Sequence, residues 1–148
     1  MRIIKAEARL AVIGIVFLAV LIMGGCATTI KYTYDTRNGF SGLKSYRWAP
    51  SSAMDSLLQT NVQVFAEQFL EQKGFTKMSE KSDLLISMTY QYEYGSPYQL
   101  SMLTLNIYKS EPNQLIWRGT AYGSICTDAP YKDLQQAVQG ILVNFPPK

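Results

Sequence analysis

Residues 84–94 read LLISMTYQYEY, and the alternation within this stretch decides the fold class. Every second residue from Leu84 to Tyr94 is apolar or aromatic, whereas the residues between them are mostly polar. Successive side chains of a β-strand point to opposite sides, so a period of two with one apolar side predicts a half-buried strand.

Two more alternating segments follow after short turns. Residues 95–97 (Gly-Ser-Pro) precede an alternating segment over 102–108, and residues 111–113 (Glu-Pro-Asn) precede a third strand over 114–124. Parallel neighbours need long crossover connections, so these tight turns predict an antiparallel meander.

The rest of the mature chain predicts two short strands, within 30–34 and 44–48, and two helices. Apolar residues spaced by three and four predict helices over 58–73 and 131–144. The candidate N-caps of the first helix are Ser52 and Asp55. We therefore expect an α+β fold: a mainly antiparallel sheet, made of short N-terminal strands plus the three-strand meander, with two helices packed on one face.

The N-terminus has the order of features that a bacterial lipoprotein export signal requires. Residues 10–23 are uniformly non-polar, follow the basic residues Arg2, Lys5 and Arg9, and precede Gly24-Gly25-Cys26. A positive start, a short apolar segment and small residues before the cleavage point are typical of a secretory signal. The cysteine after the small pair is where such precursors are lipidated.

A permanent transmembrane helix is the alternative interpretation of this segment. Its fourteen apolar residues span roughly 21 Å, short of the roughly 30 Å hydrocarbon core of a bilayer. We therefore predict a cleaved signal peptide over 1–25, a lipidated Cys26 with a short tether over 26–29, and one α+β domain over 30–148. The covalent lipid on Cys26 is the only cofactor-like group expected.

Composition agrees with an exported single domain. Loss of residues 1–25 removes three of 14 basic and one of 11 acidic residues, which leaves the mature chain nearly neutral. Nucleic-acid modules usually carry a strongly basic face, so no nucleic-acid partner is expected. The three residues from Ala27 to Thr29 reach at most about 10–11 Å, which predicts a domain held close to the membrane.

The order of several segments in the mature chain resembles one known family. These segments are Tyr32-Thr33-Tyr34-Asp35, Phe40 to Trp48, Lys73-Gly74-Phe75, Ser82 to Ser87, Leu115 to Ala121 and Phe145 to Lys148. Together they resemble envelope lipoproteins that carry the domain of unknown function 4136. The resemblance implies a lipid-anchored α+β domain of Gram-negative bacteria, without an established reaction, cofactor or catalytic residue. In such bacteria, Ala27 after the lipidated cysteine implies sorting to the outer membrane, facing the periplasm.

Catalysis is disfavoured by the residue types present. The chain has no histidine, which removes Ser-His-Asp and Cys-His arrangements and the usual zinc ligands. Paired carboxylates stay formally possible, with Glu93 beside Glu111 or Asp128, but no spacing places two of them across a cleft. We therefore expect no enzyme, no catalytic residue and no metal site.

Cys126 is the second of the chain's two cysteines. If Cys26 carries lipid, Cys126 has no intramolecular partner and is a small, partly buried residue at a strand end. A thiol for intermolecular pairing, and a Cys26–Cys126 disulfide that would exclude acylation, stay open.

Tyrosines are the most suggestive feature of the mature domain. Tyr90 and Tyr92 share the apolar face of Leu84, which predicts packing under a helix with their hydroxyls near the rim. Tyr94 and Tyr98 flank the turn at 95–97 and are candidates for contact with a partner. Two functions stay open: an adaptor that binds an envelope protein or cell-wall glycan, and a structural lipoprotein without a specific ligand.

Overall fold

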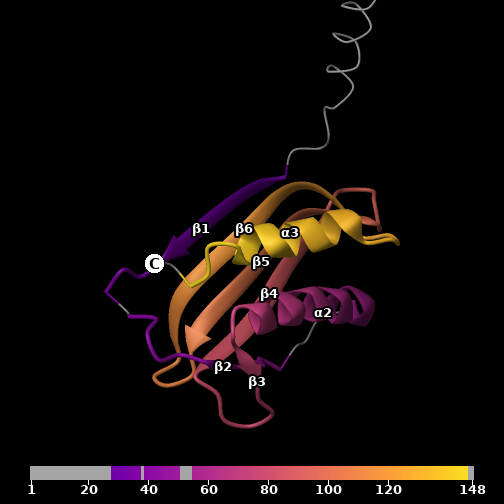
Figure 1. The fold of residues 1–148 in the computed structure, drawn as a ribbon. Helices are drawn as coiled ribbons and strands as arrows, with labels where there is room; N and C mark the ends of the chain where they lie inside the picture. The colour runs from indigo at the N-terminus through magenta and orange to yellow at the C-terminus, as the bar shows by residue number, and fades with distance from the viewer. Residues whose placement is uncertain (1–27, 38, 51–54, 147–148) are drawn as a thin grey trace, which may run out of the picture.

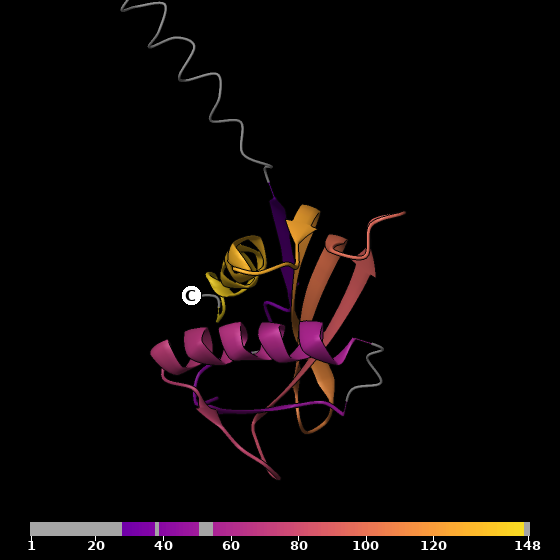
Figure 2. The same ribbon diagram turned by 90° about the vertical axis from the view of Figure 1, so that its right-hand side faces the viewer.

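The computed structural model describes residues 28–37, 39–50 and 55–146. They form one six-stranded sheet with two helices on one side of it (Figures 1 and 2). The strands are β1 (Thr29–Tyr34), β2 (Ser45–Trp48), β3 (Thr76–Lys77), β4 (Leu84–Tyr92), β5 (Gln99–Lys109) and β6 (Gln114–Cys126). The helices are α2 (Ser56–Gln72), which follows β2, and α3 (Lys132–Leu142), which follows β6.

The expectation of a mainly antiparallel sheet is wrong, because the sheet is mixed. Its order is β1-β6-β5-β4-β2-β3. The meander β4-β5-β6 is antiparallel, and β1 pairs antiparallel with β6. However, β2 pairs in parallel with both β3 and β4. The two N-terminal strands therefore do not form a unit: β1 lies at one edge of the sheet and β2 near the other.

The parallel pairing follows from the helix between the paired strands. Parallel neighbours need a crossover of a dozen or more residues, and α2 lies in the connection from β2 to β4. The strand–helix–strand order in the sequence predicts this parallel pair. The short turns, from which an antiparallel sheet was expected, report only on the meander of β4, β5 and β6.

Asp55 fixes the start of α2. Its side chain accepts a hydrogen bond of 2.9 Å from the Leu58 backbone N–H, as an N-cap does. The Tyr92 hydroxyl donates to the same carboxylate, and the Asp55 backbone N–H donates to the Tyr90 hydroxyl. Both tyrosines therefore pack beneath the helix with their hydroxyls at its rim, as the sequence predicted.

The spacing of apolar residues in the sequence predicts Leu58, Val62, Phe65 and Phe69 on the buried face of α2. Leu58 and Val62 are buried as predicted, but the next two buried residues are Ala66 and Leu70, whereas Phe65 and Phe69 only pack against the edge of the core.

Helix α3 lies directly over β6, at a glycine. A Cβ atom added at Gly119 would lie 2.6 Å from Cγ2 of Ile141, closer than real Cβ contacts come. A Cβ atom added at Gly140 of the helix would lie 3.0 Å from the side chain of Ile30, which is on the neighbouring strand β1. Two glycines, one on the strand and one on the helix, therefore allow α3 to cover β6 and β1 closely.

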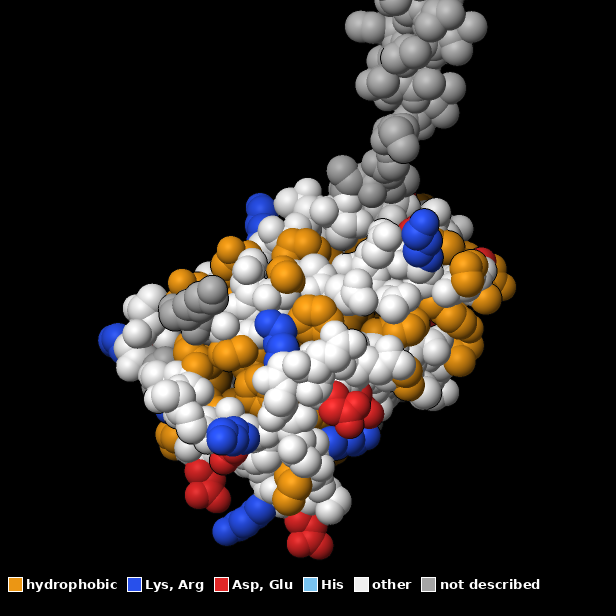
Figure 3. Space-filling model, in the orientation of Figure 1, with side chains coloured by type: hydrophobic (Ala, Val, Ile, Leu, Met, Phe, Trp, Pro, Cys, Tyr) orange, Lys and Arg blue, Asp and Glu red, His pale blue; other side chains and the backbone are white. Residues whose placement is uncertain are grey.

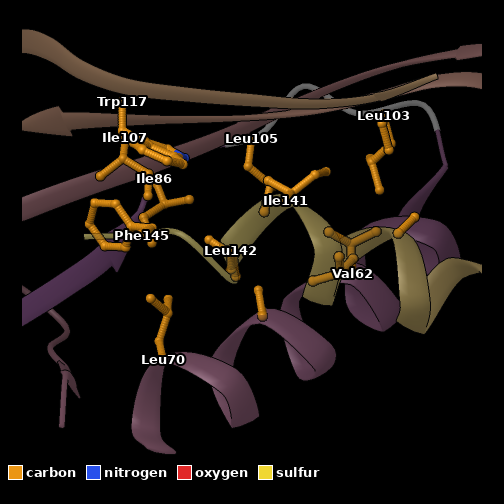
Figure 4. Packing of buried hydrophobic residues seen from close by; sticks show 14 of the residues in the cluster. Val62, Leu70, Ile86, Leu103, Leu105, Ile107, Trp117, Ile141, Leu142 and Phe145 are labelled. Atoms are coloured by element: carbon orange, nitrogen blue, oxygen red, sulfur yellow. The ribbon is translucent and has the colours of Figure 1, made fainter. Parts of the chain in front are cut away.

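The hydrophobic core fills the space between the helices and the sheet (Figure 4). Residues from β4, β5, β6 and both helices are fully or almost fully buried, including Ile86, Leu105, Trp117, Ile141 and Phe145. Each such aliphatic or aromatic side chain contributes about 1.5–3 kcal/mol by leaving water. The core lies on one side of the sheet only.

Substitution of Gly119 by alanine tests the close approach of α3. The new methyl group collides with Ile141, so we expect Gly119→Ala to lower the free energy of unfolding by about 1–3 kcal/mol. Urea unfolding followed by circular dichroism measures this change.

The matched control is Gly39→Ala, where the nearest atom to an added Cβ is 3.7 Å away. Both substitutions reduce the entropy of the unfolded chain alike. A shift within about 0.5 kcal/mol is expected for the control. Equal stability of the two variants would contradict the packing described for α3.

The Asp55 cap predicts a pH-dependent contribution to stability. The hydrogen bonds from the Leu58 N–H and then from Tyr92 lower the pKa of Asp55 below 3.8. A lowered pKa in the folded state gives stability that is present above the unfolded pKa and lost as the pH falls through the folded pKa. We expect Asp55→Ala to cost about 1 kcal/mol near neutral pH, and the difference from the natural chain to shrink in acid toward the difference between Asp55→Asn and Asp55→Ala.

Asp55→Asn is the control, because it keeps a capping oxygen but does not ionise. Its stability relative to Asp55→Ala is expected to stay constant from neutral pH into acid. Thermal unfolding at a series of pH values measures both variants. A difference between the natural chain and Asp55→Ala that does not change with pH would refute the role given to the carboxylate.

Candidate functional site

The strands carry basic side chains and no acidic ones. Their charged residues are Lys31, Arg47, Lys77, Lys109 and Arg118, and the six strand sequences contain neither Asp nor Glu. The acidic residues of the described chain lie instead in helices, turns and loops. The sheet is therefore a cationic element within a chain that is nearly neutral.

Three of these five cations point away from the helices. Gly119 faces α3, so its neighbour Arg118 faces the opposite side. The register places Lys31 opposite Thr120, which is on that same side. Arg47 lies between strand residues that face the core and is opposite Leu85. Lys77, by contrast, is paired with Glu67 of α2 at 2.6 Å.

We call this side of the sheet the uncovered face. Its residues are Lys31, Thr33, Arg47, Leu85, Ser87, Thr89, Gln91, Met102, Thr104, Asn106, Tyr108, Arg118, Thr120 and Tyr122. Hydroxyl, amide and cationic groups predominate, in contrast to the apolar side beneath the helices. Figure 2 shows that neither α2 nor α3 lies on this side.

A shallow depression of about 520 Å³ lies over β1 and β6 on this face. It is lined by Lys31, Tyr32, Thr33, Arg118, Thr120 and Tyr122. The Lys31 ammonium lies 5.6 Å from the centroid of the Tyr122 ring, and that tyrosine is 42% exposed. The depression thus combines two cations with an accessible aromatic ring.

Hydrogen bonds fix the centre of the uncovered face. The hydroxyl groups of Thr104 and Thr120 lie 2.9 Å apart, and both residues are buried. Next to them, Arg118 donates from Nε to the Asn106 side-chain oxygen at 2.7 Å. This bond holds the guanidinium in place and leaves its terminal nitrogens able to donate to an anion. The arrangement suits non-covalent binding of carboxylates or phosphates.

The tyrosines singled out in the sequence lie elsewhere. Tyr94 is 103% exposed and Tyr98 is 59% exposed, on the turn between β4 and β5. They are close to each other in the chain, but they do not share the depression with Lys31 and Arg118. The predicted lipidation site Cys26 and sorting residue Ala27 lie outside the described residues.

The carboxylates considered for catalysis do not form a pair across a cleft. Glu93 follows β4 at one end of the sheet, whereas Glu111 follows β5 at the other end. Glu93 accepts a hydrogen bond from the Ser124 hydroxyl at 3.2 Å. Asp128 precedes α3 without capping it by its side chain; the Asp128 backbone carbonyl accepts a hydrogen bond from the Tyr131 N–H.

Asp83 accepts three hydrogen bonds, and these bonds are structural. Its Oδ2 atom accepts from the backbone N–H groups of Lys44 and Ser45 at 2.9 Å each, and from the Ser45 hydroxyl. These bonds, first that from Lys44, lower the pKa of Asp83 below 3.8. A carboxylate held ionised by the backbone joins β2 to β4 and is a poor proton carrier near neutral pH.

Within residues 28–37, 39–50 and 55–146, no group of three His, Cys, Asp or Glu side chains is placed to hold a metal ion. The same ranges contain no helix long and apolar enough to cross a membrane. Cys126 is half-buried and is not part of a disulfide.

The helix-covered side offers no comparable charged surface. Its acidic and basic side chains are scattered over α2, α3 and the adjoining loops (Figure 3). Trp117, expected in the core, is fully buried there beneath the half-exposed rings of Tyr32 and Tyr34, at centroid distances of 5.3 and 5.6 Å. The sheet residues on this side are therefore covered by the packed core and are not available to bind a ligand.

The residues that the sequence analysis missed are Lys31, Asn106 and Arg118. Alternation placed each on the polar side of its strand, which is normally a solvated surface. The overlooked signal was the scarcity of acidic residues in the predicted strand segments, where Glu93 is the single one; with the strand bounds of the structure, every strand lacks Asp and Glu. Their convergence depends on β1 pairing with β6, a long-range register that periodicity does not report.

Comparison with solved structures finds the same fold in distant proteins. A PDZ domain protein from Parabacteroides distasonis superposes with a TM-score of 0.61 at 17% identity, over 82% of this chain and 36% of that chain. This chain thus spans only a part, 36%, of that protein. A PelC dodecamer from Paraburkholderia phytofirmans gives a TM-score of 0.56 at 10% identity, over 78% of this chain and 95% of that chain. A variant of the same PelC gives 0.58 at 11% identity, with equal coverage.

These identities show similarity of fold and carry no function to this chain. A comparison with curated protein sequences gave no match. The family model described as domain of unknown function, DUF4136, matches residues 30–147, which include both helices and nearly the whole sheet. This chain therefore belongs to the DUF4136 family.

Proposed function

We propose that this chain is a non-catalytic binding module of the bacterial envelope. Lipid on Cys26 holds it beside the outer membrane, and its uncovered face binds carboxylate-bearing glycan of the cell wall.

The signal-like N-terminus supports the envelope location. The apolar segment, the small pair before Cys26 and the Ala27 that follows are the residues from which lipidation and outer-membrane sorting were predicted. The described domain begins at Thr28, within two residues of Cys26. A domain attached this closely to a lipid works next to the membrane surface.

The observation that supports an anionic ligand is that the strands of the sheet contain basic residues and neither Asp nor Glu. Lys31 and Arg118 flank a depression that Tyr122 also lines, and the central Thr104 and Thr120 hydroxyls add hydrogen-bonding groups. Cations attract carboxylates, and an exposed tyrosine ring offers a flat surface for a sugar.

The polarity of the face favours a glycan over a protein as its partner. The centre of a stable protein interface is usually apolar and poor in charge. Here the central positions are threonine, asparagine and arginine. An envelope protein remains the competing partner, and a structural lipoprotein without a ligand is the competing function.

Neutralising the two cations of the depression tests this proposal. We expect the combined Lys31→Gln and Arg118→Gln variant of the full chain to bind purified cell-wall sacculi more weakly, by up to roughly thirtyfold, because each of the two exposed charge pairs contributes up to about 1 kcal/mol. Co-sedimentation with sacculi at low and high salt measures the effect. Added salt is expected to weaken binding of the natural chain more than that of the variant.

The control removes the same charge elsewhere, as Lys109→Gln with Lys132→Gln. Lys109 is opposite Leu84 on the helix side of the sheet, and Lys132 begins α3. This variant is expected to bind as the natural chain does, and urea unfolding checks that both variants are folded. If sacculi bind neither the natural chain nor any variant, the cell-wall glycan is excluded as the ligand. If crosslinking in cells captures an acidic protein through Lys31, that protein is the partner of the uncovered face in place of the glycan.

A further inference from the structure

The turn between β4 and β5 projects from one end of the sheet and exposes two tyrosines. The backbone N–H of Glu93 donates to the Gln99 carbonyl, and Ser96 N–H donates to the Glu93 carbonyl. Gly95 has a φ of 78°, a conformation that glycine adopts without strain. The turn is thus held by its own hydrogen bonds while Tyr94 is fully exposed and Tyr98 is 59% exposed.

Strand register places this turn at the same end of the sheet as the N-terminus of β1. Thr29 is opposite Tyr122, Tyr122 is opposite Met102, and Met102 is opposite Gln91. Thr29 and Gln91 are therefore level across the sheet. Figures 1 and 2 both show β1 beginning at the end where the β4–β5 turn projects.

The tether and the turn have the same maximum reach beyond that level. Cys26 precedes Thr29 by three residues, and Tyr94 follows Gln91 by three residues. At about 3.3 Å per residue, each reaches at most about 10 Å further. Three strand spacings separate them sideways, which is about 14 Å at roughly 4.8 Å per spacing.

We propose that Tyr94 and Tyr98 rest in the headgroup region of the bilayer, as a second, non-covalent contact beside the lipid on Cys26. This inference depends on the lipidation proposed above. Because Cys26 precedes Thr29 by only three residues, a lipid surface that holds Cys26 lies within about 10 Å of the end of the sheet from which the turn projects.

The chemistry of the turn suits a lipid surface. Tyrosine is enriched where membrane meets water, because its ring is apolar and its hydroxyl is hydrated. The turn contains no basic residue, and its one carboxylate, Glu93, accepts from Ser124. The contact therefore does not require anionic lipid.

Two points of contact would fix the orientation of the domain. Because both lie at one end of the strands, the strands stand roughly along the membrane normal. The uncovered face then looks sideways into the periplasm, and Lys31 and Arg118 stay accessible. The turn between β5 and β6, which contains Glu111, lies furthest from the membrane.

A tryptophan at the turn tests the contact in the full lipidated chain. We expect the emission of Tyr94→Trp, in vesicles of phosphatidylcholine brominated near the headgroups, to be quenched several-fold more than that of the matched variant Glu80→Trp. Glu80 is exposed in the connection between β3 and β4, which leads to the opposite end of the sheet. The natural Trp48 and Trp117 give the same background in both variants.

The outcomes separate the two proposals. Flotation of the natural chain with the vesicles reports the lipid anchor; a chain that stays in solution overturns the anchoring and this contact with it. A chain that floats while Tyr94→Trp is quenched no more than Glu80→Trp overturns only the contact of the turn. Equal quenching in vesicles with and without phosphatidylglycerol is expected, and quenching seen only with phosphatidylglycerol contradicts the uncharged contact described here.

Discussion

The contact of α3 with β6 at Gly119 is the constraint on which the rest of the structure depends. Only a residue without a side chain at this position lets Ile141 approach the strand, and Gly140 allows the same closeness to β1. Together, α2 and α3 cover the apolar side of the sheet, so the core lies between the helices and the sheet and needs no further layer on the opposite side. The other side is then left to polar and cationic residues, and the functional surface is a consequence of one-sided packing.

Much of the local structure could be predicted from the sequence, because it depends on near neighbours. The meander of residues 84–126 follows from alternation and tight turns, and Asp55 as a cap follows from local hydrogen bonding. The arrangement of the N-terminal strands could not be predicted in this way. β1 pairs with residues almost ninety positions later in the chain, and β2 reaches β4 only across α2. Such pairings are decided by packing of the whole domain.

The residues of the candidate site also differ in whether local sequence or the fold of the whole domain determines them. Tyr94 and Tyr98 were found because a turn between strands exposes what it carries, and their exposure is local. Lys31 and Arg118 were missed because each alone is an ordinary charge on the polar side of a strand. They become a site only when β1 pairs with β6 and Asn106 positions the guanidinium. The scarcity of acidic residues in the predicted strand segments, where Glu93 is the single one, was a global signal available from the sequence.

The tether gives this surface its place in the envelope. If Cys26 is acylated, the start of β1 lies within about 10 Å of a bilayer, and every argument on orientation follows from that reach. Mass spectrometry of the mature N-terminal peptide, from the full chain produced in a Gram-negative host, tests this most directly. The account predicts a chain that starts at Cys26 and carries acyl chains on it. A peptide that retains residues before Cys26, or one whose Cys26 is an unmodified thiol, would contradict it.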